Sequence, residues 1–102
     1  MITVLINATI KPAYIEEFKQ IASLLTKESR RRRGCVYYSF NQRIDSPNEF
    51  VLYEQWQSQS DLDAHIQALI VLLGPPRTGE MLPKKLLNMY EKAEPVFYNT
   101  IE

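Results

Sequence analysis

The chain has 102 residues, and its 12 basic and 12 acidic side chains give a formal net charge of zero at pH 7. This length is typical of one domain, so we expect a single domain over residues 1–102. The balanced charge argues against a nucleic-acid-binding protein, and one cysteine with one histidine falls short of the about four ligands that a structural zinc site needs.

The cysteine content and the apolar runs indicate where the protein works. Cys35 has no second cysteine with which to form an intrachain disulfide, and the first residues carry no basic leader. The longest apolar run, residues 68–73, is far shorter than the roughly 18 residues of a membrane span. We therefore expect a cytoplasmic protein without a membrane partner.

The first third of the chain predicts a strand followed by a helix. Residues 2–10 are short and β-rich, and Pro12 suits the first turn of the helix that follows. One apolar face of this helix is formed by Tyr14, Phe18, Ile21 and Leu25. The helix ends in Arg30 to Arg33 and Gly34. In a chain of zero net charge, we interpret the four arginines as a solvated helix end rather than a nucleic-acid patch.

The middle of the chain predicts an antiparallel hairpin. Residues 35–44 alternate as a strand, residues 45–48 contain preferred turn residues, and residues 50–57 form the next strand. In the first of these strands, Val36, Tyr38 and Phe40 are expected to share one face. In the second, one face holds Phe50, Leu52, Glu54 and Trp56.

The last part predicts a second helix and a fourth strand. The helix begins at Ser58 or Ser60, each followed three residues later by an aspartate, as in a capping box. Its apolar stripe is Leu62, Ile66, Leu69 and Leu73, and residues 74–76 end it. A short helix within residues 82–90 and a strand over residues 95–101 complete the chain.

The predicted order is β-α-β-β-α-β, which is an α+β, ferredoxin-like arrangement with a four-stranded antiparallel sheet. Both helices then pack on one face of the sheet. The other face carries Val51 and Tyr53, and it is too apolar to remain in water on a monomer. We therefore expect a homodimer in which two sheets pack together.

His65 and Glu54 are the candidate catalytic residues. His65 shares a helix face with Leu62 and Leu69, where it is either a half-buried structural histidine or a general base. Glu54 lies in mid-strand on an apolar face, where a carboxylate is costly unless it is solvated at the strand edge or paired. If this face meets the helices, His65 is its possible partner.

Two further polar groups are candidates for binding. Trp56 is either a core residue or the wall of a pocket, and its indole N–H needs an acceptor. Asn7 interrupts an apolar strand, so its amide either satisfies backbone groups or faces a polar cavity. The three glycines form no phosphate-binding loop, so we expect no flavin, nicotinamide or nucleotide cofactor and no metal.

The sequence resembles the antibiotic biosynthesis monooxygenase family over almost its whole length. The resemblance is carried by residues 2–6 running into residues 11–18 and by residues 34–35, and it is strongest in residues 53–58 followed by Leu62 and Ala64-His65. It implies ferredoxin-like subunits that pair as a dimeric α/β barrel, with one pocket per subunit between sheet and helices. Leu52 and Leu62 stand where the polyketide-tailoring members have Asn and Tyr. Asn7 stands where many members have Glu.

The resemblance implies an enzyme that oxidises a small quinol or related aromatic enol with O₂ and no cofactor. His65 would then be the base or proton relay, Glu54 would orient it, and Trp56 and Asn7 would hold the ring. Apolar walls are expected from Phe40, Leu52, Leu69 and Leu72. The alternatives are a non-catalytic ligand-binding dimer, and an isomerase or haem-degrading enzyme of the same fold. An RNA-recognition domain has the same order of elements, but residues 50–56 lack its glycines and its cation.

Overall fold

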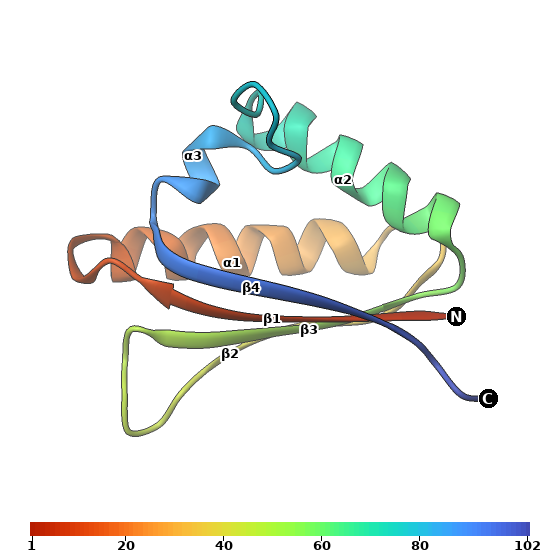
Figure 1. Ribbon diagram of the computed structural model, residues 1–102, viewed down its shortest axis with the longest axis horizontal. Helices are drawn as coiled ribbons and strands as arrows, with labels where there is room; N and C mark the ends of the chain where they lie inside the picture. Colours follow the sequence, from red (N-terminus) through yellow and green to blue (C-terminus); the bar gives the residue numbers. More distant parts are fainter.

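The computed structural model describes all 102 residues. Its elements are β1 (Ile2–Ile10), the 3₁₀ turn η1 (Pro12–Tyr14), α1 (Ile15–Arg30), β2 (Cys35–Gln42), β3 (Glu49–Trp56), α2 (Gln59–Leu73), α3 (Lys84–Leu87) and β4 (Tyr90–Asn99). The helices α1 and α2 lie on one face of the sheet, and the opposite face carries no helix (Figure 1).

The four strands form one sheet in the order β2-β3-β1-β4, and every neighbouring pair is antiparallel. This is the α+β, ferredoxin-like architecture that the sequence predicts. The central strands β3 and β1 alternate between the two faces, so Leu52, Glu54 and Trp56 all point toward the helices. The register therefore brings a carboxylate and an indole to the inside of the molecule.

Local signals explain where α2 begins. The Ser58 hydroxyl accepts a hydrogen bond from the backbone N–H of Asp61 at 3.2 Å, so Ser58 rather than Ser60 is the N-cap. Gly34, in the turn after α1, has φ +84°, and a Cβ there would clash with the Asp61 side chain. A glycine is needed at this position because the turn approaches the start of α2 closely.

The core lies between the sheet and the two helices. Trp56, Phe18 and Ile10 are completely buried. The Phe18 ring of α1 makes edge contacts with three aromatic rings of the sheet, with centroids 5.0–5.8 Å away. This aromatic cluster holds α1 against one end of the sheet.

Two predicted boundaries and one predicted face are wrong. The helix expected from Pro12 begins as a 3₁₀ turn, and its α-helical part starts only at Ile15. The fourth strand starts at Tyr90 rather than residue 95, because β1 pairs with it as far as Ile10. Val36 does not share a face with Tyr38, because an irregularity between Cys35 and Tyr37 shifts the register and leaves Val36 44% exposed.

The outer face of the sheet carries a line of apolar side chains across all four strands. The registers bring Leu5 opposite both Tyr53 and Val96. The rings of Tyr37 and Tyr53 pack edge to face with centroids 5.2 Å apart. Tyr37, Val96 and Tyr98 are between 42% and 49% exposed.

No helix of the protein has the length and apolar character required to cross a bilayer.

Candidate functional site

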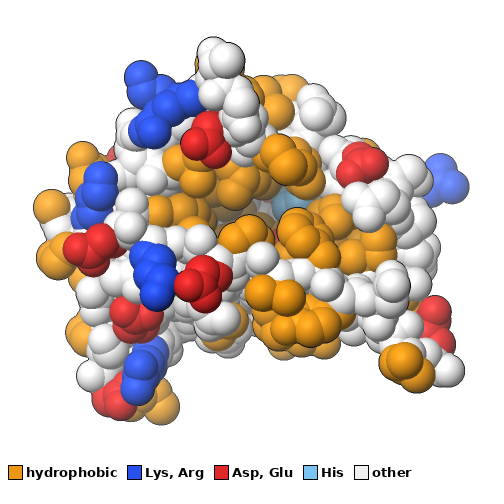
Figure 2. All heavy atoms as spheres, in the orientation of Figure 1, with side chains coloured by type: hydrophobic (Ala, Val, Ile, Leu, Met, Phe, Trp, Pro, Cys, Tyr) orange, Lys and Arg blue, Asp and Glu red, His pale blue; other side chains and the backbone are white.

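A cavity of about 450 Å³, here called the main cavity, lies between the sheet and the segment from α2 to α3. Of its 21 lining residues, 16 are hydrophobic, so the few polar groups in it stand out. Figure 2 shows a hollow rimmed by hydrophobic side chains, with the only histidine of the chain visible inside it. The volume falls within the range of small-molecule sites.

Glu54 projects from β3 into this apolar surrounding and is only 4% exposed. The Trp56 side chain lies two residues on, on the same strand face, and its Nε1–H donates to Glu54 Oε1 at 2.6 Å. Burial raises the pKa of Glu54 to about 7, although the hydrogen bond from Trp56 opposes this shift. The carboxyl group is therefore held in one orientation and changes charge near neutral pH.

His65 meets Glu54 from the opposite layer. It lies on the buried stripe of α2, where its ring stacks on Trp56 with centroids 4.6 Å apart and an interplanar angle of 29°. Its Nε2 is 3.7 Å from Glu54 Oε1, and its Nδ1 is buried without a hydrogen-bond partner. Burial, assisted by the Arg32 cation, lowers the pKa of His65 to about 4.

These two shifts define the charge state of the site at neutral pH. The imidazole is neutral, and the carboxyl exists in both its protonated and ionised forms. Glu54 is therefore the group whose pKa best suits the transfer of a proton at neutrality. His65 offers a neutral ring that can accept a proton at one nitrogen and hold one at the other.

Two tyrosines and Glu80 add to the polar lining of the main cavity. Tyr38 of β2 packs edge-on against the His65 ring at 5.4 Å, and Tyr90 lines the cavity at the start of β4. Burial raises the pKa of both phenols, and the neighbouring Glu54 raises it further. Both hydroxyls therefore stay protonated over the working pH range and can donate hydrogen bonds. No three His, Cys, Asp or Glu side chains cluster as metal ligands.

The family described as antibiotic biosynthesis monooxygenase matches residues 1–69. This segment covers β1, α1, the hairpin and most of α2, and so it includes Glu54, Trp56 and His65. The chain belongs to this family.

Relatives of known structure share the family's fold. A “Putative antibiotic biosynthesis monooxygenase” from Nitrosomonas europaea is 22% identical with a TM-score of 0.82, and the match covers 100% of both chains. A variant of SnoaB, a cofactor-independent oxygenase from Streptomyces nogalater, is 16% identical with a TM-score of 0.74 over 99% of this chain and 93% of its own. At these identities the likeness concerns the fold.

A curated relative matches a shorter segment. “Putative monooxygenase YcnE” of Bacillus subtilis (strain 168) is 30% identical over 56 residues. That segment is 55% of this chain and 59% of the relative, so the match spans little more than half of either protein.

The structure brings together most of the site residues that the sequence predicts. Phe40, Leu52 and Leu69 line the main cavity with Glu54 and His65. Three other predicted positions, Asn7, Trp56 and Leu72, do not line the main cavity.

Asn7 lies on the outer face of the sheet and is exposed, because Ala8 and its even-numbered neighbours in β1 point toward the helices. The expectation that Asn7 holds a ligand in the cavity is therefore wrong. Trp56 is completely buried and does not line the cavity. Its indole lies behind Glu54 and His65, where it positions both rather than forming a wall.

Leu72 is 42% exposed and lines a separate hollow between α1 and α2. The sequence reasoning also missed Tyr38, Tyr90 and Arg32. Tyr38 could have been found from its alternation with Phe40. Tyr90 was expected within a helix, and Arg32 only as part of a solvated helix end, where it is indeed exposed. Nothing local in the sequence placed Tyr90 in the main cavity or Arg32 next to His65.

Proposed function

We propose that this protein is a cofactor-independent monooxygenase that oxidises a small quinol or a related aromatic enol with O₂. The observation that carries the proposal is a carboxyl group, with a pKa of about 7, in an apolar cavity large enough for a small aromatic molecule. Membership of the family and the presence of a cofactor-independent oxygenase among proteins of the same fold support it.

The chemistry requires little from the protein besides a base and a dry site. Loss of one proton gives a quinol anion that is electron-rich enough to donate directly to O₂. Quinol plus O₂ then gives hydroxyquinone plus water, so that one oxygen atom enters the ring and the other is reduced to water. An apolar enclosure strengthens the electrostatic interactions of the anion with the polar groups around it.

Three polar residues and the apolar walls of the cavity have roles in this scheme. The Glu54 carboxylate takes the hydroxyl proton of the substrate, and the Trp56 N–H fixes the carboxylate that does so. His65 accepts the proton from Glu54 and acts as its relay. Phe40, Leu52 and Leu69 provide the apolar walls against which the ring packs.

The proposal is tested with menadiol, a bicyclic quinol, under ¹⁸O₂. Monooxygenation places one ¹⁸O atom in the quinone product and the other in water, at a rate above that of spontaneous oxidation. Conversion of an enolisable substrate that proceeds equally well without oxygen would instead indicate an isomerase. Saturable binding of menadiol without conversion would indicate a ligand-binding protein, and either result contradicts the proposal.

We also propose that the protein works as a cytoplasmic homodimer formed through the outer face of the sheet. The support is the apolar line on this face, in which Leu5 and Tyr53 are partly exposed and Tyr37, Val96 and Tyr98 are exposed. Sedimentation equilibrium at micromolar concentration should give twice the 11.9 kDa of one chain. The Tyr53→Asp variant should sediment as a monomer, whereas Ser39→Asp, at the edge of the same face, should remain dimeric. A monomeric wild-type protein would contradict the proposal.

A further inference from the structure

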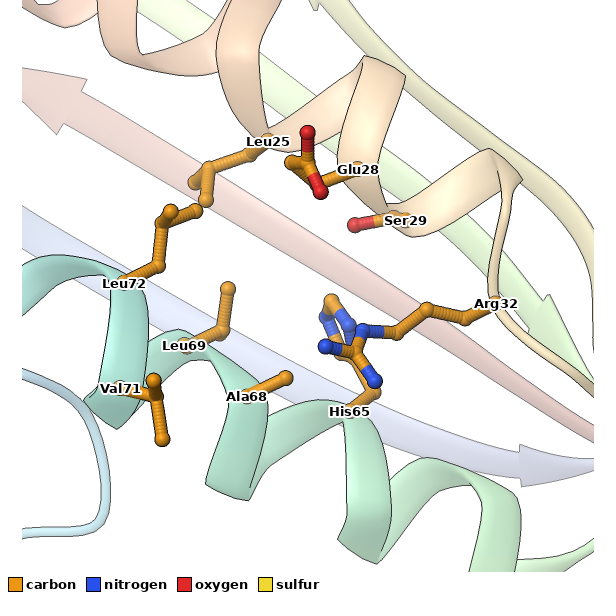
Figure 3. Close-up of a pocket in the computed structure, with 9 residues that line it drawn as sticks. All are labelled: Leu25, Glu28, Ser29, Arg32, His65, Ala68, Leu69, Val71 and Leu72. Carbon is orange, nitrogen blue, oxygen red and sulfur yellow. The ribbon is translucent and has the colours of Figure 1, made fainter.

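A second hollow of about 320 Å³, here called the helix cleft, lies between α1 and α2. Figure 3 shows its lining, with side chains from both helices and with Arg32, from the turn after α1, lying next to His65. Three residues line both the helix cleft and the main cavity, namely Leu25, His65 and Leu69. These three side chains therefore form the wall between the two hollows.

His65 is the only polar side chain in that wall. Its Nε2 lies 3.7 Å from Glu54 Oε1, and Glu54 lines the main cavity but not the helix cleft. Its Nδ1 is buried and has no partner in the protein. A neutral imidazole carries one proton on either nitrogen, so it can accept a proton at Nε2 and release one from Nδ1.

The surroundings of the His65 ring disfavour a stable imidazolium, so the ring passes a proton on rather than retaining it. Glu54 of β3 and Tyr38 of β2 approach it from the sheet, and Arg32 approaches it from the turn after α1. The Arg32 cation contributes to the lowered pKa of His65, so the imidazolium is a short-lived carrier. Glu28 also lines the helix cleft, and it is half-buried and paired with Arg31 at 3.6 Å.

We propose that the helix cleft is a proton path that connects Glu54 with bulk water through His65 while a substrate closes the main cavity. The proposal rests on the proposed function. One proton leaves the quinol for Glu54, passes to His65 Nε2, and is matched by release of the Nδ1 proton to water in the cleft. The path runs in reverse when the reduced oxygen atom becomes water, so no net proton is gained or lost.

The test uses the single histidine of the chain, which gives one set of imidazole signals in protein labelled with ¹⁵N-histidine. NMR then measures how fast the ring N–H protons exchange with water, and no substrate is required. Ala68→Phe fills the helix cleft, whereas Ala93→Phe fills the main cavity. Ala64→Phe is the matched control, because Ala64 is exposed on α2 and lines neither hollow.

Ala93→Phe stands in for a substrate that closes the main cavity, so in that background the exchange should run through the helix cleft, and Ala93→Phe or Ala64→Phe alone should leave it near the wild-type rate. Adding Ala68→Phe to Ala93→Phe should slow the exchange at least about tenfold, since exchange then requires local opening. An unchanged rate in the Ala68→Phe/Ala93→Phe double variant, or an equal slowing in Ala93→Phe alone, overturns the proposal. Leu72→Trp, at an exposed position on the rim of the cleft, replaces Ala68→Phe if that variant does not fold.

Turnover tests whether the path is used. With menadiol and O₂, Ala68→Phe should lower kcat at least about tenfold and leave KM unchanged, because the substrate still fits the main cavity. Slowed exchange with an unchanged kcat overturns the role of the path in turnover. If the wild-type protein does not oxidise quinols although the exchange pattern holds, the proposed function fails and the second opening to His65 stands.

Discussion

A variant without Glu54 and a variant without His65 should differ in how their free energy of unfolding depends on pH. It should rise with pH in the first variant and fall with pH in the second. In the folded chain, burial raises the pKa of Glu54 from 4.5 to about 7, so its contribution to stability is present at low pH and is lost as the pH rises between these values. Burial lowers the pKa of His65 from 6.5 to about 4, so its contribution is lost as the pH falls through that window. The two effects offset each other in the wild-type protein.

The expected size follows from the shifts. Each shift corresponds to about 3 kcal/mol in the free energy of unfolding, and both side chains are nearly completely buried. In Glu54→Gln, which keeps an acceptor for the Trp56 N–H, only His65 titrates, so stability should rise by about 3 kcal/mol from pH 4 to 6.5. In His65→Phe, which keeps a ring on Trp56, stability should fall by about 3 kcal/mol from pH 4.5 to 7.

The assay is urea unfolding followed by tryptophan fluorescence at a fixed protein concentration, since association alters apparent stability. The double variant Glu54→Gln/His65→Phe gives the reference slope from all other groups. If the two side chains formed a buried ion pair, the pKa of Glu54 would be low and that of His65 high, and breaking the pair would be costly. Reversed slopes, or single variants with the slope of the double variant, would refute the reasoning.

Three further variants separate positioning, backbone strain and location. Trp56→Phe removes the N–H that holds down the pKa of Glu54, so the acidic limb of the pH–rate profile for kcat, along which the Glu54 carboxylate forms, should move to higher pH. Gly34→Ala should destabilise the fold by about 1–3 kcal/mol in thermal or urea unfolding, and by more than Gly79→Ala, because both have φ +84° but only Gly34 lacks room for a Cβ. Asn7→Ala should leave kcat and KM unchanged in the same assay, and a loss of turnover would return Asn7 to the site.

The sequence predicts the fold well where its periodicity is strong. Alternation in β3 places Glu54 under the helices, and the helical repeat places His65 opposite it, so their meeting follows from two local patterns and one assumption about layers. The start of β4 could not be predicted this way. Residues 90–94 carry little apolar pattern, and their pairing with β1 is a tertiary contact.

The site was predicted less completely than the fold. For Asn7, the choice between satisfied backbone and polar cavity depended on which face of β1 meets the helices, and a one-residue difference in phase moves a side chain across the sheet. Arg32 belongs to a run of four arginines whose members are equivalent in sequence. Only the path of the turn after α1 brings Arg32, rather than its neighbours, next to His65.

The measurement that most directly tests the central claim is the rate of O₂ uptake with menadiol for the chelator-treated wild-type protein and its Glu54→Gln variant. The account predicts uptake well above spontaneous oxidation for the wild-type protein. Glu54→Gln should lose roughly 10²-fold or more of this rate, the scale expected for removal of a general base, while remaining folded. Wild-type uptake no faster than spontaneous oxidation, or full turnover by Glu54→Gln, would contradict the account.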